Sequence, residues 1–446
     1  MTSNATTGAA PRVAFFGHDC TELTLIKRAR AFRAAGLEVR GFTFRRDKLN
    51  RAYVPEWDDL DLGTTVDRHY GRRLLKLIRA LPRILRARRR LGACDLIYAR
   101  NIDMAGLALA GRWLAGSRAP LIYEVLDVQR VFTSSGPAGA LFRFLERRVL
   151  ARTDLLVVSS EAFVRRYFEP VQGFRGAWFL LENKIFGLDP AMVAARPTPA
   201  RPGAPPCPPD APWVIAWLGN LRCPRSPHLL RGLAQALGDR VQVHIHGFPT
   251  ETGFERFMEL IGAQANLIYK GEYRSPEDLP RIYRGAHFAW AFDYLDAGSN
   301  SDWLLPNRLY EAGFFGVPAL AAAGTETGRR VEQLGLGWTV GEPVEETVAA
   351  LLRGLTPEAY LERRRRLLGL PRSTFLDEGD TARLVAILLG TGADVAIPPL
   401  APGLLRPASG WPEGDGARHP VVTDDARRPA PPVSARRSPA AILEPD

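Results

Sequence analysis

Short apolar runs alternate with longer amphipathic segments along the first half of the chain. Segments such as TELTLIKRARAFRAAG and ALFRFLERRVLAR repeat their apolar residues at helical spacing. The apolar runs themselves are continuous, which is typical of strands buried on both faces of a parallel sheet. Strands separated by helices of about 10–15 residues predict βαβ units. The expected strands are VAFFG (13–17), EVRGFTF (38–44), DLIYA (95–99), PLIYEVL (120–126) and DLLVVSS (154–160).

A second series of the same kind follows residues 189–212, where Pro and Ala dominate without periodicity. Because proline fixes φ and lacks a backbone donor, this stretch is predicted to be a linker. Ser275 and Pro276 predict the start of a helix over 276–284. The expected strands of this series are WVIAWLG (213–219), VQVHIHG (241–247), ANLIYKG (265–271), HFAWAF (287–292) and VPALAA (317–322).

The length of 446 residues exceeds what a single hydrophobic core usually supports. We therefore predict an α/β protein with two Rossmann-like, doubly wound domains, residues 12–188 and 213–391. The two ends, 1–11 and 392–446, show no apolar rhythm, and we expect them to be disordered.

The cysteines and the apolar runs bear on the compartment. Four scattered cysteines form no CxxC pair, which fits a reducing environment better than a disulfide framework or a zinc cluster. No secretory signal is visible, and no run reaches the roughly 18 apolar residues of a membrane-spanning helix. A cytoplasmic protein, at most peripheral on the inner face of the cell membrane, is expected.

The net charge of +11 is concentrated in one segment. Residues 68–90 hold ten Lys or Arg and no acidic residue, interleaved with Leu and Ile and interrupted by Pro82. This pattern predicts a basic amphipathic helix on an anionic membrane surface. The alternative is a solvated helix packed on its own domain. Nucleic acid is not an expected partner, because no recognition motif accompanies the charge.

Open parallel sheets bind ligands at the carboxyl ends of their strands, so chemistry is sought there. In SDWLLPNRLYEAGFFGVPA (301–319), Asn307 and Glu311 lie four apart on one helix face. The helix N-terminus can bind phosphate, and Glu311 can accept hydrogen bonds from ribose hydroxyls. The candidate donor-binding residues of this segment are Asp302, Asn307, Arg308 and Glu311. The alternative is a surface ion pair between Glu311 and Arg308.

A second candidate is the strand-to-helix turn GNLRCPRSPHLL (219–230). Arginines at such a turn suit a diphosphate, which they can bind bidentately. The alternative is a solvated loop. The candidate donor-binding residues here are Gly219, Asn220, Arg222 and Arg225.

The first domain offers candidate catalytic side chains after two of its strands. Glu124 and Asp127 follow a buried strand, where a carboxylate can orient or deprotonate an acceptor hydroxyl. The alternative for Asp127 is a helix N-cap. His18 and Asp19 occupy the first strand-to-helix turn, which lacks the GxGxxG of a dinucleotide site. The HIH at 244–246 has no third ligand nearby, so no metal site is expected.

These motifs together resemble a known family. PNRLYEAGFFGVPAL is similar to the donor-site helix of the retaining GT-B glycosyltransferases of family 4. YEVLDVQ, FLERRVLARTDLLVVSSEAF and WLGNLRCPRS resemble other motifs of its bacterial members that build surface polysaccharides, over roughly residues 12–370. The resemblance implies a GT-B fold with two domains facing a central cleft. It also implies transfer from a UDP- or GDP-sugar to a hydroxyl acceptor, without a metal or other cofactor.

By position, the resemblance implies that Glu311 holds the donor ribose and that Arg225 takes the place of a phosphate-binding lysine. Asn220 stands where many members have Arg. A second Glu, common eight residues before the first, is replaced by Trp303 with Asp302 beside it. Family 4 members retain anomeric configuration, whereas related GT-B enzymes invert with an Asp base, a role open to Asp127.

The expected function is extension of a lipid-linked glycan in exopolysaccharide, capsule or lipopolysaccharide synthesis. One alternative is a sugar-nucleotide epimerase of the same two-domain shape, which leaves the basic segment without a role. The other is a non-catalytic GT-B-like protein that binds a glycan or a partner, a hypothesis favoured by Trp303.

Overall fold

The computed structural model describes residues 9–46, 52–65, 70–208, 210–250, 253–262, 264–391 and 405–406. These residues belong to one compact unit, Met1–Ser409. Most of the two ends expected to be disordered, 1–11 and 392–446, lies outside the described residues. The exceptions are residues 9–11 and residues 405–406, which pair with a strand of the first sheet.

The first sheet has strand order β14-β7-β6-β5-β4-β1-β2-β3 in the described part of the chain. Its neighbours pair in parallel, except for β14 against β7. The register places Phe15 opposite Gly41 of β2 and Tyr98 of β4. The strands are β1 (Arg12–Gly17), β2 (Glu38–Arg45), β3 (Asp58–Thr64), β4 (Leu96–Arg100), β5 (Leu121–Val125), β6 (Leu155–Val158), β7 (Trp178–Leu180) and β14 (Leu405–Arg406).

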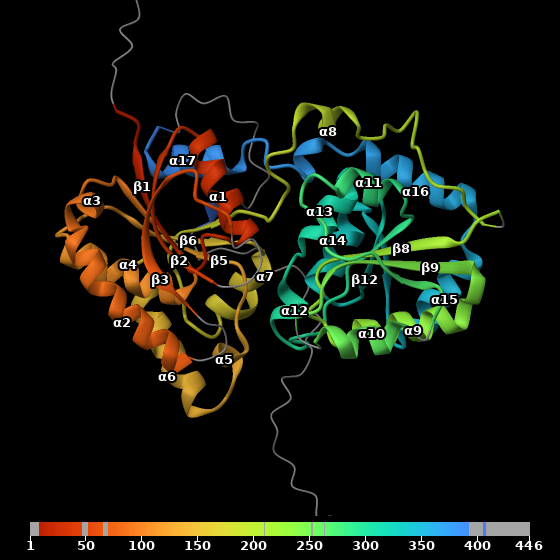
Figure 1. The fold of residues 1–446 in the computed structure, drawn as a ribbon, viewed down its shortest axis with the longest axis horizontal. Coiled ribbons are helices and arrows are strands. Elements are labelled where there is room, and N and C mark those ends of the chain that lie inside the picture. Colours follow the sequence, from red (N-terminus) through yellow and green to blue (C-terminus); the bar gives the residue numbers. More distant parts are fainter. Residues whose placement is uncertain are drawn as a thin grey trace, which may run out of the picture. The chain divides into compact units, whose positions relative to one another are not determined.

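Helices cover both faces of this sheet (Figure 1). They are α1 (Leu23–Ala34), α2 (Tyr70–Arg86), α3 (Arg88–Gly92), α4 (Ile102–Leu114), α5 (Arg130–Thr133), α6 (Pro137–Leu150) and α7 (Glu161–Phe163), which continues into a π-helical turn, Val164–Phe168.

The second sheet has the order β10-β9-β8-β11-β12-β13, and all its pairs are parallel. Its strands are β8 (Trp213–Asn220), β9 (Val241–Phe248), β10 (Leu267–Tyr269), β11 (Phe288–Trp290), β12 (Ala319–Ala322) and β13 (Gly337–Val340). Its helices are α9 (Ser226–Leu237), α10 (Phe254–Gly262), α11 (Leu279–Arg284), α12 (Asn300–Trp303), α13 (Asn307–Phe314), α14 (Glu326–Leu334), α15 (Val344–Gly354) and α16 (Pro357–Gly369).

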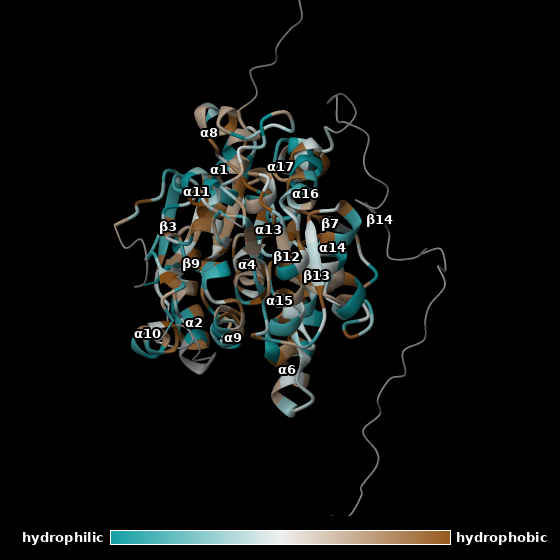
Figure 2. Ribbon diagram, turned by 90° about the vertical axis from the view of Figure 1, so that its right-hand side faces the viewer, coloured by the Kyte–Doolittle hydropathy of each residue, from teal (hydrophilic) through white to brown (hydrophobic). Residues whose placement is uncertain are grey.

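Each sheet lies between two apolar layers. Phe16 of β1 faces the layer formed with α2 and α4, whereas Phe15 faces the layer formed with α1. In the second sheet, Trp217 and Leu218 of β8 face opposite layers in the same way. In Figure 2 the covering helices carry both brown and teal residues, as expected for elements with one buried and one solvated face. The prediction of two doubly wound parallel sheets is confirmed.

The sequence pattern missed four of the described strands, and one of them, β14, lies in the tail that was expected to be disordered. β3 has the sequence DDLDLGT at a sheet edge, and of its residues only Leu62 is fully buried. β7 has three residues, and β13 has four, including Gly337 and Thr339. Short or polar edge strands lack the long apolar run on which the prediction relied.

Three elements differ from the expectations. The helix predicted over 276–284 begins only at Leu279. Helix α2 continues through Pro82 to Arg86, although proline was expected to interrupt this run. The segment 189–212, expected to be an unpacked linker, contains the short helix α8 (Pro190–Ala194), whose N-cap is Asp189.

Two segments tie the two sheets together. α17 (Asp380–Leu388), expected in the second domain, packs beside α1 and adds Leu384 and Val385 to the core of the first domain (Figure 1). The linker in turn packs on the second domain, where Arg196 donates a 2.8 Å hydrogen bond to the carbonyl of Phe314. The chain thus crosses twice between the domains.

Candidate functional site

Asp127 lies just beyond the end of β5 and meets the second domain. Asn300 of α12 donates a 2.9 Å hydrogen bond to its carboxylate and accepts one of 2.8 Å from the backbone N–H of Val128. The guanidinium of Arg222 lies 3.8 Å from the same carboxylate, which remains about half exposed. The surrounding protein raises the pKa of Asp127, while Arg222 and Asn300 oppose that rise. The carboxylate is therefore accessible and held by side chains of both domains.

Glu124, three residues earlier, is in a different environment. Its side chain is almost fully buried, and the guanidinium groups of Arg28 and Arg100 lie 3.0 and 2.9 Å from its two oxygens. Arg28 also donates to Thr381 of α17, and Arg100 donates to Thr24. Both oxygens of Glu124 are therefore occupied by buried ion pairs that link β4, β5 and α1.

His18 and Asp19 form the turn after β1, and both are buried. His18 contacts Glu22 at 2.8 Å with one ring nitrogen and Asn101 at 3.3 Å with the other. Asp19 accepts hydrogen bonds from the backbone and hydroxyl of Thr21, at 3.0 and 2.7 Å. Both side chains thus have partners within the first domain that fix the shape of this turn.

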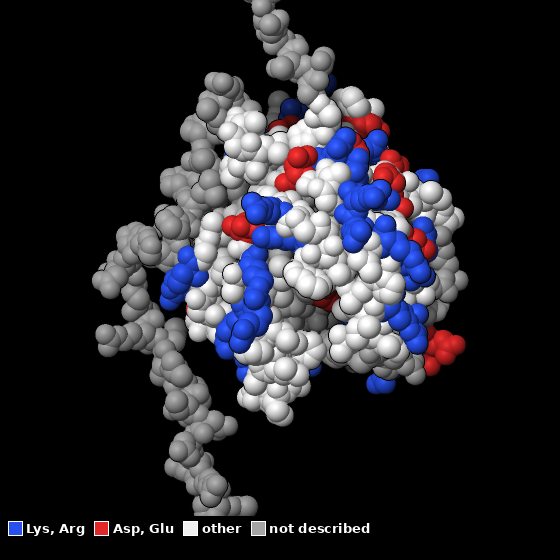
Figure 3. All heavy atoms as spheres, turned by 90° about the vertical axis from the view of Figure 1, so that its left-hand side faces the viewer, with Lys and Arg blue, Asp and Glu red and all other residues white. Residues whose placement is uncertain are grey.

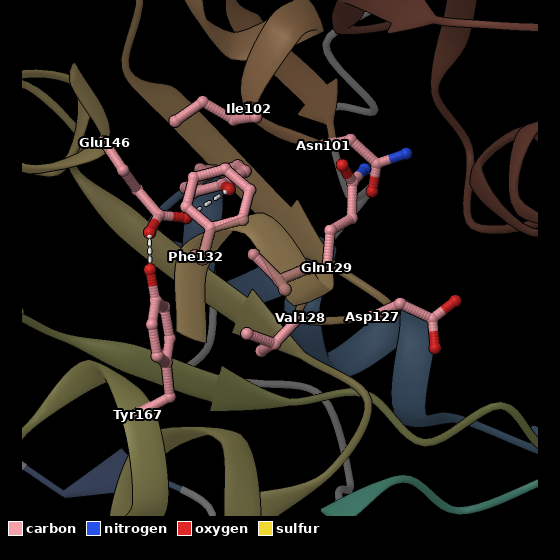
Figure 4. Close-up of a pocket in the computed structure, with 10 residues that line it drawn as sticks. Asn101, Ile102, Asp127, Val128, Gln129, Phe132, Glu146 and Tyr167 are labelled. Carbon is pink, nitrogen blue, oxygen red and sulfur yellow. Dashed lines mark hydrogen bonds between the residues drawn. The ribbon is translucent and has the colours of Figure 1, made fainter. Parts of the chain in front are cut away.

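A buried polar cluster supports the segment that carries Asp127. Glu146 of α6 accepts hydrogen bonds from the hydroxyls of Tyr123 and Tyr167 (Figure 4). Burial raises the pKa of Glu146, and the two tyrosine hydroxyls oppose that rise. A cavity of about 10 Å³, the size of one water molecule, lies between this cluster and Asp127. The carboxylate of Asp127 points away from the cluster (Figure 4).

In the second domain, the strand ends β8 and β9 approach each other closely at two glycines. Gly219 and Gly247 both have positive φ, and a Cβ on Gly247 would lie 1.9 Å from the carbonyl of Gly219. Any larger residue at 247 would therefore separate the strands, which explains the glycine at this place. Asn220, next to Gly219, accepts a 2.6 Å hydrogen bond from Thr250.

The two arginines of the following loop differ in their surroundings. Arg222 forms a 3.1 Å ion pair with the buried carboxylate of Asp293, and its pKa is raised because Asp127 and Asp293 outweigh the effect of burial. Arg225 is half exposed, pairs with Glu342 at 2.8 Å and lies over the ring of Tyr294. Arg222 is thus fixed beside Asp127, while Arg225 lies further out on the surface.

Helix α13 places the remaining donor candidates. Arg308 does not pair with Glu311; its guanidinium donates instead to the carbonyls of Leu218 and Phe292, at 3.3 and 2.8 Å. Glu311 is half-buried and accepts a 3.4 Å hydrogen bond from Tyr283. Burial raises the pKa of Glu311, whereas Lys27 of α1 and Arg308 oppose that rise. The surface ion pair considered as an alternative is absent among the described contacts.

Lys27 is a residue of the first domain whose charge acts on Glu311 of this helix. Its ammonium donates 2.9 Å hydrogen bonds to the Asn183 side chain and to the Lys184 carbonyl. Burial, together with the neighbouring Arg28, lowers the pKa of Lys27 to about 8, while Glu311 opposes that change. No sequence pattern marked this lysine, because it lies inside an ordinary amphipathic helix.

The helix start and the short helix before it complete the region. Asn307 is the first residue of α13 and is half-buried. Asp302 accepts a 3.1 Å hydrogen bond from the backbone of Gly298 and thereby holds its own turn. Trp303 packs against the core of the first domain, and its carbonyl accepts a 2.6 Å hydrogen bond from Ser160. The residue that replaces the family's second Glu is therefore a contact between domains.

The two histidines of β9 differ in burial, His244 being partly buried and His246 buried. Burial lowers the pKa of His244 and lowers that of His246 to about 4. Within the described residues, no group of three or more His, Cys, Asp or Glu side chains is placed to hold a metal ion. None of the helices in this described part of the chain has the length and apolar character that crossing a membrane requires.

Comparison with known proteins identifies the family. Residues 27–177 match the Glycosyl transferase 4-like domain. The succinoglycan biosynthesis protein ExoL of Rhizobium meliloti is 32% identical over 375 residues, which cover 84% of this chain and 92% of the relative. The chain belongs to glycosyltransferase family 4. For this glycosyltransferase, the resemblance inferred from its motifs is confirmed.

Solved structures agree with the GT-B fold of the enzyme. Sucrose-phosphate synthase from Thermosynechococcus elongatus aligns with a TM-score of 0.62 and 18% identity, over 86% of this chain and 99% of the other. Anabaena HepE, solved with UDP and glucose, aligns with a TM-score of 0.61 and 14% identity, over 85% and 100%. The predicted GT-B architecture is confirmed.

Sequence reasoning missed several residues of this region. Asn300 fixes Asp127, Asp293 fixes Arg222, and the charge of Lys27 acts on Glu311. Asn300 directly precedes the segment SDWLLPN, so the polar residues around it could have marked Asn300 as a candidate site residue. Asp293 is brought to Arg222 by the pairing of β8 with β11, and Lys27 is brought near Glu311 by the contact between domains. No local pattern encodes either approach.

Proposed function

We propose that this glycosyltransferase moves a sugar from a UDP- or GDP-sugar to a hydroxyl of a lipid-linked glycan during polysaccharide synthesis. It needs no bound metal in this proposal, because the cations offered to the diphosphate are arginines. The observation that carries the proposal is the position of Asp127. An accessible carboxylate of the first domain is held by Asn300 and Arg222 of the second, so acceptor and donor groups converge there.

The donor is assigned to the second domain. Glu311 is half-buried on α13 and is proposed to accept hydrogen bonds from the ribose hydroxyls, with Asn307 at the helix start. Arg222 and Arg225 are proposed to neutralise the diphosphate. Arg225 has to exchange Glu342 for phosphate, whereas Arg222 is already fixed by Asp293. HepE, which has the same fold, was solved with UDP-glucose, and this supports a nucleotide-sugar donor here.

The remaining donor candidates are assigned to shaping the site. Gly219 and Asn220 are proposed to shape the turn that receives the diphosphate, and Arg308 fixes α13 to the ends of β8 and β11. Asp302 holds the turn before α13 through Gly298.

The acceptor is assigned to the first domain. Asp127 is proposed to orient the attacking hydroxyl or to accept its proton, since its environment already raises the pKa of this carboxyl. Glu124, His18 and Asp19 are proposed as positioning residues, because each has partners within its own domain.

The membrane contact is assigned to α2, which makes the proposed enzyme peripheral on the inner face of the cell membrane. Ala80 and Ile84 of this helix are buried, but Leu74, Leu75 and Ile78 are exposed beside its cations. A helix that only packed on its own domain would not need this exposed apolar surface. Figure 3 views the molecule from the side of α2, where bands of blue side chains flank white surface. ExoL, named for succinoglycan biosynthesis, supports a role in polysaccharide synthesis.

The test is a panel of sugar nucleotides with the purified full chain. A donor present at 100 times its Kd stabilises the folded protein by about 2.7 kcal/mol, which thermal unfolding detects. The stabilising donor is then incubated with a lipid-linked glycan, with and without a chelator. Transfer that survives the chelator is expected. Conversion of the free nucleotide sugar to its epimer would overturn the transferase assignment, and absence of binding to every donor would favour a non-catalytic protein.

A further inference from the structure

An apolar hollow of about 1210 Å³ opens on the first domain between α2, α4 and α6. Small-ligand pockets usually measure about 300–1,000 Å³, so this hollow suits a longer occupant. Its walls come from all three helices, and they include Leu74 and Ile78 of α2, Leu107 and Trp113 of α4, and Leu141 and Leu145 of α6.

These walls are apolar and yet open to solvent. Trp113 is 80% exposed, Leu74 is 59% exposed and Leu141 is 56% exposed. Three neighbouring helices thus leave large apolar side chains uncovered around one depression. A continuous exposed apolar surface of this kind usually marks a binding site.

The charge around the hollow indicates what it binds. The charged residues that line the hollow are four arginines and two aspartates. Both aspartates already form ion pairs, one with Arg73 and one with Arg112. Arg148 and Arg152 are exposed and have no acidic partner among the described residues. An apolar trough with excess positive charge is complementary to a hydrocarbon chain that carries a phosphate.

The hollow and the cavity beside the candidate acceptor site share part of their walls. Gln129 and Phe132 line the hollow, and they also line the small cavity whose wall includes Asp127. A chain lying in the hollow would therefore contact Gln129, which follows Asp127 by two positions in the sequence.

We propose that this hollow binds the hydrocarbon chain of the lipid-linked acceptor, one molecule at a time, with its phosphate at the arginine rim. The proposal rests on the proposed function and deepens it, because it assigns the lipid to a groove of the enzyme itself. The glycan attached to that lipid is thereby brought toward Asp127. The bilayer remains the source of the lipid, and α2 lies at its surface.

The experiment titrates the full chain with single-chain alkyl phosphates from octyl to hexadecyl, below their micelle concentrations. Fluorescence of Trp113 is the readout, and Trp113→Phe identifies its signal. Burial of each added methylene is expected to tighten binding by up to about fourfold. A saturable one-to-one signal that grows with chain length supports the proposal.

Two variants test the location. A side chain on Gly106, a lining residue inside α4, meets no atom within 4 Å at its Cβ, so Gly106→Leu fills the hollow without a clash at that atom. It is expected to weaken hexadecyl phosphate binding at least tenfold. Leu74→Gln, on the wall, is expected to weaken it at least threefold. Leu75→Gln is the matched control, because Leu75 is exposed on the same helix but does not line the hollow.

Other results would overturn the proposal. Equal binding by Leu74→Gln and Leu75→Gln, or binding only to phosphatidylglycerol vesicles and never to monomeric alkyl phosphate, would show a bilayer contact without a chain site. Binding that appears only after removal of residues 392–446 would show that the hollow is occupied by the chain's own end. UDP binding is measured in parallel by thermal unfolding. If the wild type binds alkyl phosphate but not UDP, the result counts against the proposed function and leaves the hydrocarbon-chain site supported.

Discussion

Replacing Glu311 with Gln isolates the charge of the proposed ribose-binding residue. Gln keeps the size of the side chain and can still accept the 3.4 Å hydrogen bond from Tyr283. The change therefore removes a carboxylate while leaving the buried contacts of α13 in place. A hydrogen bond to a charged group contributes about 1.5–3 kcal/mol, so donor affinity is expected to fall roughly 10- to 150-fold.

The raised pKa of Glu311 adds a second signature. Because burial favours the protonated form, this carboxyl gains its proton at a pH where an ordinary Glu is still charged. Donor affinity of the wild type is therefore expected to fall as the pH drops through that raised pKa. The Gln variant, which has no carboxyl to titrate, is expected to lose this part of the pH dependence.

The assay is calorimetric titration of UDP and of the stabilising donor between pH 5 and 8. Glu346→Gln is the matched control, because Glu346 is exposed in the first turn of α15. Thermal unfolding without ligand checks that both variants are folded. Donor affinity of the Glu311 variant within threefold of wild type, with an unchanged pH profile, would refute the assignment of Glu311 to the donor.

Three further predictions address the acceptor carboxylate, the buried ion pairs and the membrane contact. Asp127→Asn is expected to slow transfer at least about 100-fold while UDP affinity stays within threefold, and a loss of UDP affinity instead would place Asp127 in the donor site. Glu124→Gln leaves Arg28 and Arg100 without their buried counter-charge and is expected to lower the free energy of unfolding by about 3–5 kcal/mol, measured by urea denaturation; an unchanged midpoint would show that the ion pairs contribute little. Replacing the four exposed arginines Arg79, Arg86, Arg88 and Arg89 with Gln is expected to lower cosedimentation with anionic vesicles, and salt is expected to lower that of the wild type. Arg83 is left in place because it donates a hydrogen bond to β3.

The sequence by itself determined the fold class and most of the strands. Continuous apolar runs such as VAFFG and WVIAWLG need burial on both faces, and a parallel sheet covered by helices provides it. The edge strand β3 was not predicted, because a strand at an exposed sheet edge needs no apolar run. Helix α13 was also predicted, since its start, its end and the spacing of Asn307 and Glu311 are local features.

Only the tertiary structure decided what each candidate side chain contacts. Glu124 and Asp127 are three residues apart and look alike in sequence, yet one is buried between two arginines and the other is half exposed beside Asn300. Packing of α1 and β4 around β5 makes that difference, and it depends on residues distant along the chain. The partners of Arg308 and the position of Lys27 were likewise set by packing between elements. Local pattern follows from the chemistry of neighbouring residues, whereas burial and charge pairing follow from which elements meet in space.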